Sequence, residues 1–451
     1  MPLAYLFLDL NAYFASVEQQ LNPAWRGKPV VVSPLDNPSG CCIAASYEAK
    51  RIGIKTGMRV GEARALCPAL IVAPSRPRKY VEFHHQILEA VETCAPVRAV
   101  HSIDEMSIRL AHGERTAEEA AALGRKIKSA IAERVGPCMR CSIGIAPNTF
   151  LAKVASDMQK PDGLVILDDQ DLPGKLLPLQ LQDLPGIGPR MDARLRLHGV
   201  TTVEKLVGLS EKELGALWGS VVGRKWWYLL RGYDLYERPT HRRSIGHQHV
   251  LPPDRRTDER AWEVAARLMH KAAARARHLG FWVQKMSLSI GYRGEKGYGW
   301  GRGGGWSGVA GFPGGTQDTI AMLEELRRLW SERAPGTPML VSVTMFDLLN
   351  AASATQPLFP EERRRSAIST AMDLVNAKQG ANTVYLGSMH DARASAPGGI
   401  AFSHIPDLDF VDSVRERQAE SEYAALQPRR GRRVSGSRRG RTLRPRGDRA
   451  G

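Results

Sequence analysis

The sequence lacks any apolar run of the roughly 20 residues that a membrane-spanning helix requires. It also lacks a charged leader with a small-residue cleavage site, since residues 5–9 already read as an apolar strand. The six cysteines are scattered, and no second pair lies near Cys138-Met-Arg-Cys141 to complete a disulfide framework or a zinc site. We therefore expect a soluble, cytoplasmic protein that makes no contact with a membrane.

Acidic residues are too few to balance the basic ones. The 451 residues include 63 Lys and Arg against 47 Asp and Glu, a formal net charge of +16. Residues 429–449 hold ten arginines and one acid, and removing these ten positive charges and one negative charge leaves about +7. The charge outside this tail predicts a partner rich in phosphate. The tail itself either binds DNA loosely or is a solvated, disordered segment.

The length exceeds what one ordinary core supports and predicts about two to four domains. Strands and helices mix within the first 165 residues, which is typical of α+β organisation. Strands are expected at residues 5–9, 28–33, 43–45, 97–110 (two strands and a turn) and 141–146. Helices are expected at residues 11–20, from residue 47, and at 60–66, 79–94, 117–135 and 148–158.

The second half of the chain changes character. Residues 178–233 read as short helices, and a tether follows at residues 239–244. The next elements predict a separate βαββαβ domain: a strand from 244, a helix at 258–279, a strand at 283–292, another strand, a helix at 318–332 and a strand at 339–346. The Gly- and Trp-rich residues 294–315 form either a long hairpin or a mobile loop. Residues 364–385 read as a helix followed by a strand.

Three carboxylates stand at or beside strand ends. Asp9 ends the first strand, and Asp104 and Glu105 lie in a strand-turn with apolar flanks. Phosphoryl and nucleotidyl transfer concentrate negative charge that two cations about 4 Å apart can stabilise, and carboxylates suit Mg²⁺. Adjacent strand residues point to opposite faces, so Asp104 and Glu105 can serve one metal pair only where the strand twists or bulges. Taken alone, an Asp-Glu pair is more often a solvated turn.

Five segments in a fixed order carry a stronger signal. The first three are Asp9-Leu-Asn-Ala-Tyr-Phe-Ala-Ser-Val-Glu18, Ser46-Tyr-Glu-Ala-Lys-Arg-Ile-Gly-Ile-Lys-Thr-Gly-Met58 and Ser102-Ile-Asp-Glu105. The fourth joins Cys141-Ser-Ile-Gly-Ile-Ala-Pro-Asn-Thr-Phe-Leu-Ala-Lys-Val-Ala-Ser156 to Lys160-Pro-Asp-Gly163, and the fifth is Leu184-Pro-Gly-Ile-Gly188. In this order and spacing they resemble the motifs of the Y-family DNA polymerases, through about residue 350.

The resemblance implies an α+β multidomain fold shaped like a right hand. Residues 1–20 and 76–167 would form the palm, residues 21–75 the small fingers, residues 168–238 a helical thumb with a helix-hairpin-helix, and residues 239–350 the βαββαβ little finger. Residues 351–426 would carry a clamp peptide and an extension of unassigned role. Residues 427–451 would form the basic, disordered tail.

The same resemblance implies roles for single residues. Asp9, Asp104 and Glu105 would hold two Mg²⁺ ions, for which Mn²⁺ can substitute, with the Leu10 carbonyl as a further ligand. Phe14 would be a steric gate that excludes a 2′-hydroxyl, although alone it reads as an ordinary core residue. The triphosphate would contact the following residues: Tyr47, Lys50 and Lys160, with Arg51 as a further candidate.

Two positions depart from many relatives, which have Arg where Lys50 stands and a hydroxyl residue where Ala44 stands. Lys cannot copy the bidentate grip of Arg. The Asp9-Leu-Asn-Ala12 opening and the Glu48-Ala-Lys50 run are closer to the catalytic subunit of the bacterial polymerase V subfamily, whereas Phe14 and Tyr47 are features of the polymerase IV subfamily. The subfamily therefore stays open at this stage.

DNA contacts are expected in two regions. Gly186 and Gly188 would let backbone N–H groups approach a DNA phosphate, with Arg190 beside them; a turn without DNA contact is the alternative. In the final domain the candidate backbone contacts are basic residues: Arg242, Arg243, Arg255, Arg256 and Lys285.

A short peptide follows the last predicted strand of the little finger. Gln356-Pro-Leu-Phe359 resembles the peptides by which bacterial polymerases dock on the β sliding clamp, with Gln356, Leu358 and Phe359 as anchors. A plain linker is the alternative interpretation.

We therefore expect a monomeric, error-prone translesion DNA polymerase that adds dNTPs to a primer on template DNA. No second carboxylate cluster is available for a proofreading exonuclease. A two-metal nuclease is one alternative, but it would not need Phe14, Tyr47 and Lys160. A non-catalytic DNA-binding scaffold that recruits other lesion-bypass polymerases is the second, and it would tolerate loss of the three carboxylates.

Overall fold

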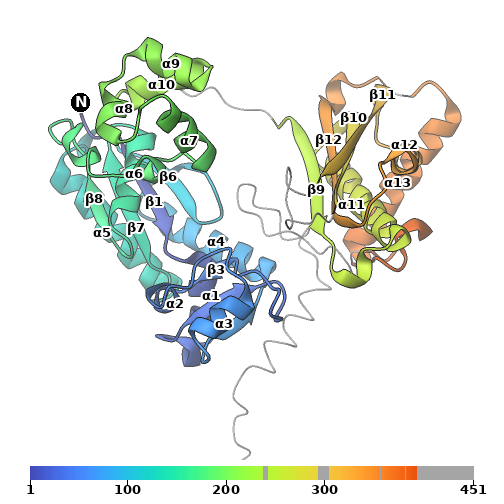
Figure 1. The fold of residues 1–451 in the computed structure, drawn as a ribbon, viewed down its shortest axis with the longest axis horizontal. Helices are drawn as coiled ribbons and strands as arrows, with labels where there is room; N and C mark the ends of the chain where they lie inside the picture. Colours follow the sequence, from blue (N-terminus) through green and yellow to red (C-terminus); the bar gives the residue numbers. More distant parts are fainter. Residues whose placement is uncertain (237–241, 293–303, 356, 381, 394–451) are drawn as a thin grey trace, which may run out of the picture.

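The computed structural model describes residues 1–236, 242–292, 304–355, 357–380 and 382–393. Figure 1 shows two bodies, one formed by the chain before residue 237 and one by the chain after residue 241. The first body contains a five-stranded and a three-stranded sheet, and the second contains a four-stranded sheet. Within the described stretches, no helix is long and apolar enough to cross a membrane.

β1 (Tyr5–Leu10) is the middle strand of the five-stranded sheet, whose order is β5-β6-β1-β7-β8. Strands β7 and β8 run parallel, and the other neighbours are antiparallel. The other strands are β5 (Val97–Val100), β6 (Glu105–Arg109), β7 (Cys141–Ala146) and β8 (Leu164–Ile166). All six residues of β1 are buried, Asp9 included, which is why the strand is otherwise apolar.

Helices cover both faces of this sheet, and alternation along β1 feeds two cores. The helices are α4 (Pro77–Glu92), α5 (Ala117–Arg134) and α6 (Thr149–Met158). The leucines of β1 belong to the core built with α4 and α5, whereas Tyr5 and Phe7 belong to the core built with α6. Asp9 shares the parity of Tyr5 and Phe7, so it points to the face that α6 covers.

α1 (Tyr13–Leu21) carries a fully buried acid toward α4. Glu18 Oε1 lies 3.0 Å from Arg76 Nε and its Oε2 lies 2.5 Å from Arg76 Nη2, and the Tyr80 hydroxyl donates to Oε1 at 2.9 Å. Burial raises the pKa of Glu18, and the Arg76 charge and both hydrogen-bond partners oppose that shift. This network ties α1, which begins beside Asp9, to the chain that enters α4.

The three-stranded sheet has the order β3-β2-β4 and a core of its own. Its strands are β2 (Val30–Ser33), β3 (Ala44–Ala45) and β4 (Ile71–Pro74), and its helices are α2 (Tyr47–Arg51) and α3 (Val60–Leu66). The sequence pattern predicted each of these elements except β4. Four residues that end in proline give no periodicity to recognise, and β4 is held by parallel pairing with β2.

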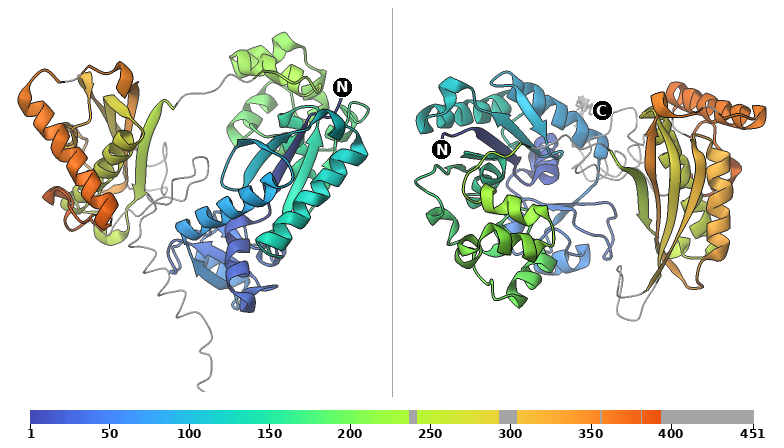
Figure 2. Two further views of the ribbon diagram at one scale, coloured as in Figure 1. Left: turned by 180° about the vertical axis from the view of Figure 1, so that it is seen from behind. Right: turned by 90° about the horizontal axis from the view of Figure 1, so that it is seen from above.

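Four short helices follow, as the pattern of residues 178–233 predicts: α7 (Pro189–Leu197), α8 (Val203–Gly208), α9 (Glu211–Trp218) and α10 (Val221–Leu229). Figures 1 and 2 show these helices and the three-stranded sheet at opposite ends of the five-stranded sheet. Asn148 is the N-cap of α6, and its side chain accepts from Leu151 N–H at 2.8 Å. Its Nδ2 donates to the Leu229 and Tyr233 carbonyls at 2.9 and 3.1 Å, which fastens the end of α10 to α6.

The second body confirms the predicted βαββαβ order. Its antiparallel sheet has the order β11-β10-β12-β9, with β9 (Ser244–Val250), β10 (Phe281–Tyr292), β11 (Gly305–Thr316) and β12 (Pro338–Asn350). Helices α11 (Asp258–His278) and α12 (Thr319–Glu332) cover one face (Figure 2). The antiparallel pairing of β10 with β11 agrees with the hairpin alternative for residues 305–315, while residues 293–303 lie outside the described stretches.

α13 (Pro360–Gln379) extends this second body past β12. Arg277 of α11 donates to Asp373 of α13 from Nε at 2.6 Å and from Nη2 at 2.9 Å. The predicted helix in residues 364–385 is therefore confirmed, but the strand predicted after it is wrong. Residues 382–386 form turn and coil, because the Asn376 side chain bonds the N–H and the carbonyl of Val384 at 2.9 Å each and turns the chain back onto α13.

Candidate functional site

A pocket of about 350 Å³ lies where the end of β1 meets α1, β3, α2, β6 and α6. Four of the five sequence motifs contribute to it, and three carboxylates face three ammonium groups. The lining residues are Asp9, Leu10, Ala12, Tyr13, Phe14, Ile43, Ala44, Ala45, Tyr47, Lys50, Thr56, Asp104, Glu105, Lys153 and Lys160.

Asp9 and Glu105 are direct partners in the β1–β6 pairing. Asp9 is only 6% exposed at the end of a buried strand. The Lys153 ammonium lies 2.5 Å from Asp9 Oδ2 and 2.8 Å from Glu105 Oε1. One lysine of α6 therefore bridges the two carboxylates.

Asp104 reaches the same pocket from a turn. β6 begins at Glu105, so Asp104 is not a strand residue and the alternation of side chains along a strand does not apply to the pair. Asp104 and Glu105 therefore reach one pocket without a bulge in β6. The Leu10 N–H donates to the Asp104 carbonyl at 2.8 Å, and the Ser102 hydroxyl donates to Asp104 Oδ1 at 2.6 Å. Burial raises the pKa of Asp104; the Ser102 hydrogen bond opposes this, and the Asp9 and Glu105 charges add to it.

Two lysines contact these carboxylates and balance their negative charge. Lys160 Nζ lies 2.8 Å from Asp9 Oδ1 and 2.7 Å from Asp157 Oδ1, and Lys153 Nζ lies 3.2 Å from Asp157 Oδ2. Burial lowers the pKa of Lys153 and of Lys160, but the neighbouring carboxylates outweigh it, so both pKa values are raised and both side chains stay charged. Sequence reasoning found Lys160 but missed Lys153 and Asp157. Lys153 lies in the fourth motif and Asp157 follows its first segment directly, so their spacing of four residues on a predicted helix was the available signal.

The donor atoms suit hard divalent cations such as Mg²⁺. Asp9, Asp104 and Glu105 bring carboxylate oxygens to one pocket beside the backbone of Leu10. In this conformation ammonium groups balance those charges, and within the described part of the chain no three His, Cys, Asp or Glu side chains already form a metal cluster. All six cysteines, Cys138 and Cys141 included, are free thiols.

Phe14 borders the pocket and also belongs to the core. Its ring centroid lies 4.5 Å from that of Tyr80 and 5.6 Å from that of Tyr13, and the side chain is 4% exposed. The two interpretations of this residue are therefore compatible. Packing in the core fixes the ring at the edge of the pocket.

α2 presents Tyr47 and Lys50 to the pocket, with Lys50 Nζ 4.5 Å from the centre of the Tyr47 ring. Burial lowers the pKa of Lys50 and the Lys160 charge lowers it further, whereas burial raises the pKa of Tyr47. Arg51 is exposed and is not among the residues that line the pocket. In this conformation Lys50 is thus the cation that α2 supplies.

Gly186, Gly188 and Arg190 lie together on the surface at the start of α7. Gly186 has a φ of +99°, a conformation that favours glycine, and Gly188 is the N-cap of α7. All three residues are exposed, so a partner can reach this turn.

The basic residues of the second body divide into two groups. Arg243 is exposed and Arg242 is half-buried ahead of β9. Arg256 Nε donates to the Leu251 carbonyl at 3.0 Å, and Lys285 pairs with Asp347 at 2.8 Å. These internal partners favour Arg242 and Arg243 over the other two as contacts for DNA.

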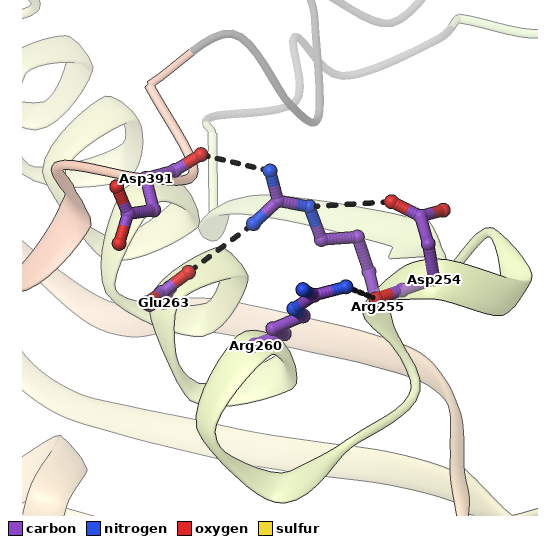
Figure 3. A pocket seen from close by; sticks show the side chains of 5 residues that line it. All are labelled: Asp254, Arg255, Arg260, Glu263 and Asp391. Atoms are coloured by element: carbon purple, nitrogen blue, oxygen red, sulfur yellow. Dashed lines mark hydrogen bonds and ion pairs between the residues drawn. The ribbon is translucent and has the colours of Figure 1, made fainter.

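Arg255 has internal partners as well. It lines a cavity of about 290 Å³, where Nη1 donates to Glu263 at 3.2 Å and Nη2 donates to the Asp391 carbonyl at 2.8 Å. Figure 3 shows its guanidinium between these two residues. Arg260 lines the same cavity and donates to the Asp254 carbonyl at 2.7 Å. Arg255 thus fastens the chain beyond α13 to α11 rather than facing outward.

The candidate clamp peptide connects β12 to α13. Leu358 is 77% exposed and Phe359, which precedes α13, is 62% exposed. Gln356, the first predicted anchor, lies outside the described residues.

Comparison with known families and proteins agrees with this geometry. The impB/mucB/samB family matches residues 8–157, and the impB/mucB/samB family C-terminal domain matches residues 242–358. The DNA polymerase IV of Moorella thermoacetica is 40% identical over 291 residues, 63% of this chain and 72% of that protein. The DNA polymerase IV of Alkalilimnicola ehrlichii is 32% identical over 291 residues, 64% of this chain and 81% of that protein.

Solved structures give the same architecture. A Y-family DNA polymerase chimera superposes with a TM-score of 0.65 at 24% identity, covering 77% of this chain and 99% of that one. An insertion ternary complex of Dbh DNA polymerase gives a TM-score of 0.52 at 24% identity, with the same coverage. These likenesses establish the right-hand polymerase fold. With the sequence relatives they show that the chain belongs to the Y family of translesion DNA polymerases.

Proposed function

We propose that this chain extends a primer on a DNA template by two-metal nucleotidyl transfer, without proofreading, and that it copies damaged templates. One observation carries the proposal: the three carboxylates share a pocket with Phe14, Tyr47, Lys50 and Lys160. A nuclease needs the carboxylates but gains nothing from a ring beside a sugar and cations beside a triphosphate. The names of the relatives favour the polymerase IV subfamily.

Asp9, Asp104 and Glu105 would hold two Mg²⁺ ions, or Mn²⁺, with the Leu10 carbonyl as a further ligand. The ions would supply stabilisation of the attacking and leaving oxygens. The protein contributes position: the pairing of β1 with β6 fixes Asp9 opposite Glu105, and the hydrogen bond from Leu10 N–H fixes the turn of Asp104.

The nucleotide would enter over α2 with its triphosphate toward Lys50, Lys160 and the Tyr47 hydroxyl. Lys160 carries its charge at the pocket already. Burial and the Lys160 charge lower the pKa of Lys50, and the negative charge of an incoming phosphate would oppose that shift. Phe14 would meet a ribose 2′-hydroxyl and so favour deoxynucleotides.

The folded units would correspond to the palm, fingers, thumb and little finger of a Y-family polymerase. The five-stranded sheet with α4 to α6 corresponds to the palm, the three-stranded sheet to the fingers, helices α7 to α10 to the thumb, and the second body to the little finger. Primer-template DNA would contact the amides of Gly186 and Gly188 with Arg190, and Arg242 with Arg243. Fingers of three short strands give little contact for checking a new base pair, which supports error-prone copying. Leu358, Phe359 and Gln356 would dock on a β sliding clamp.

Primer extension tests this proposal. The parent and Asp104→Asn would be compared with Mg²⁺ and each dNTP, on intact and on abasic templates. Asp171→Asn is the matched control, because Asp171 pairs with Lys175 at 2.8 Å outside the pocket. We expect template-dependent extension by the parent and the control but not by Asp104→Asn. A folded, DNA-binding parent that never extends a primer would contradict the proposal and favour a scaffold.

A further inference from the structure

Lys153 stands where an incoming divalent cation would be drawn. Its ammonium group bridges Asp9 Oδ2 at 2.5 Å and Glu105 Oε1 at 2.8 Å, and its side chain is 18% exposed. A metal ion and an ammonium group compete for the same carboxylate oxygens, because both are drawn by their negative charge. Opening the bridge would free Asp9 Oδ2 and Glu105 Oε1 for a metal ion.

A further carboxylate, that of Asp157, lies one helical turn away from Lys153. Asp157 follows it by four residues on α6, which puts both side chains on one face of the helix, and Asp157 Oδ2 lies 3.2 Å from Lys153 Nζ. Asp157 is not among the residues that line the pocket. The flexible four-carbon stem of lysine lets its ammonium move between neighbouring carboxylates.

We propose that Lys153 is a positioning residue that holds Asp9 and Glu105 together until the metal binds, and that it then withdraws to Asp157. The proposal rests on the proposed metal role of Asp9 and Glu105. Three carboxylates in one pocket repel one another, and an ammonium between two of them offsets that repulsion in the free protein. Lys153 therefore competes with the metal, and Asp157 favours the metal by receiving the lysine.

The competition predicts opposite effects of two substitutions on Mn²⁺ binding by the full chain without DNA or nucleotide, measured from the electron paramagnetic resonance signal of free Mn²⁺. Lys153→Met removes the competitor, so we expect a roughly tenfold lower dissociation constant, since a hydrogen bond to a charged group is worth about that factor. Asp157→Asn removes the receiving carboxylate, so the dissociation constant should rise. A merely structural role would weaken binding in both variants and would overturn the proposal.

The double variant tests whether both effects act through Lys153. Asp157 also pairs with Lys160, so its substitution could act through that lysine instead. In Lys153→Met/Asp157→Asn the effect of Asp157→Asn should vanish. If it persists at full size, Lys160 is the responsible group and the assignment to Lys153 is wrong.

Two further variants separate failure of this proposal from failure of the metal site itself. Lys79→Met removes a lysine that pairs with Glu82 at 2.8 Å on α4, and it should leave Mn²⁺ binding unchanged. Asp9→Asn should abolish Mn²⁺ binding if the metal site is correct. Loss in Asp9→Asn without any gain in Lys153→Met overturns only the role of Lys153, whereas no loss in Asp9→Asn overturns the metal site as well.

Discussion

Replacing Glu18 by glutamine should cost the first body much of its stability while leaving the pocket residues in place. Glu18 is fully buried between α1 and α4, and Arg76 is 4% exposed. Glutamine keeps the shape of the side chain but removes the charge. Burial makes that charge costly in itself, as the raised pKa of Glu18 shows, so the expected loss comes from Arg76, which would remain as a buried cation without the Glu18 carboxylate. Breaking one side of a buried ion pair typically costs about 3–5 kcal/mol.

The hydrogen bonds give a second route to the magnitude. Glu18 accepts three of them, two from Arg76 and one from Tyr80. The glutamine amide has one acceptor oxygen and presents N–H groups where the second oxygen stood, so at least one donor loses its partner. Each hydrogen bond to a charged group contributes about 1.5–3 kcal/mol, so losing one or two agrees with the range above. That is a large share of the roughly 5–15 kcal/mol that stabilises a domain.

Hydrogen exchange measured by mass spectrometry reports this loss locally, in peptides from α1 and α4, and urea unfolding reports it globally. The control is Glu18→Leu/Arg76→Met/Tyr80→Phe, which removes both charges and all three partners together and should cost clearly less than the single change. A change below about 1 kcal/mol in Glu18→Gln would refute the reasoning, because it would mean that the carboxylate does not compensate Arg76.

Three other perturbations have definite expected outcomes. Burial lowers the pKa of His270 to about 4, so the folded state resists its protonation. The contribution of neutral His270 to the free energy of unfolding is fully present above pH 6.5, and it should fall by up to about 3 kcal/mol as the pH drops from 6.5 to 4. Unfolding measured as a function of pH should show a smaller loss in His270→Gln. Asp373→Ala should destabilise the second body by about 3 kcal/mol, because Arg277 is only 9% exposed, and exchange in α13 would report it; unchanged exchange would contradict the packing described. Phe14→Ala should raise ribonucleotide incorporation relative to deoxynucleotide at least about tenfold in primer extension, and an unchanged ratio would remove Phe14 as the steric gate.

Most helices and strands of the fold were predictable, because the local sequence pattern agreed with the burial that each element has in the structure. β1 and β7 are short apolar runs that the structure buries completely, and Asn148 caps α6 as its position suggests. β4 was missed because its pairing with β2 is non-local, and the strand after α13 was predicted wrongly because Asn376 bonds Val384 and forms a turn instead. Propensity alone cannot reveal either contact.

The candidate site shows the same division. The order of the motifs identified Asp9, Asp104 and Glu105 as candidate site residues. The sequence did not show how the adjacent Asp104 and Glu105 reach one pocket. The structure explains it, because β6 begins at Glu105 and Asp104 lies in the preceding turn. The sequence showed Lys153 and Asp157 only as two charged residues four positions apart on a predicted helix. Their meaning depends on which face of the sheet α6 covers, and that follows from the parity of β1.

The extension past β12 changes how the candidate clamp peptide should be understood. The family match ends at residue 358, yet α13 is pinned to α11 through Asp373, and Met389 is buried in the same core. Leu358 and Phe359 are thus held at the junction of two folded elements rather than on a loose tail. A partner that covers these two exposed side chains need not order a disordered segment first, which removes part of the usual entropy cost of peptide binding. Loosening α13 with Asp373→Ala should therefore weaken the proposed clamp binding even though Asp373 lies outside the peptide. A surface-binding measurement with purified clamp that finds equal affinity for variant and parent would contradict this coupling.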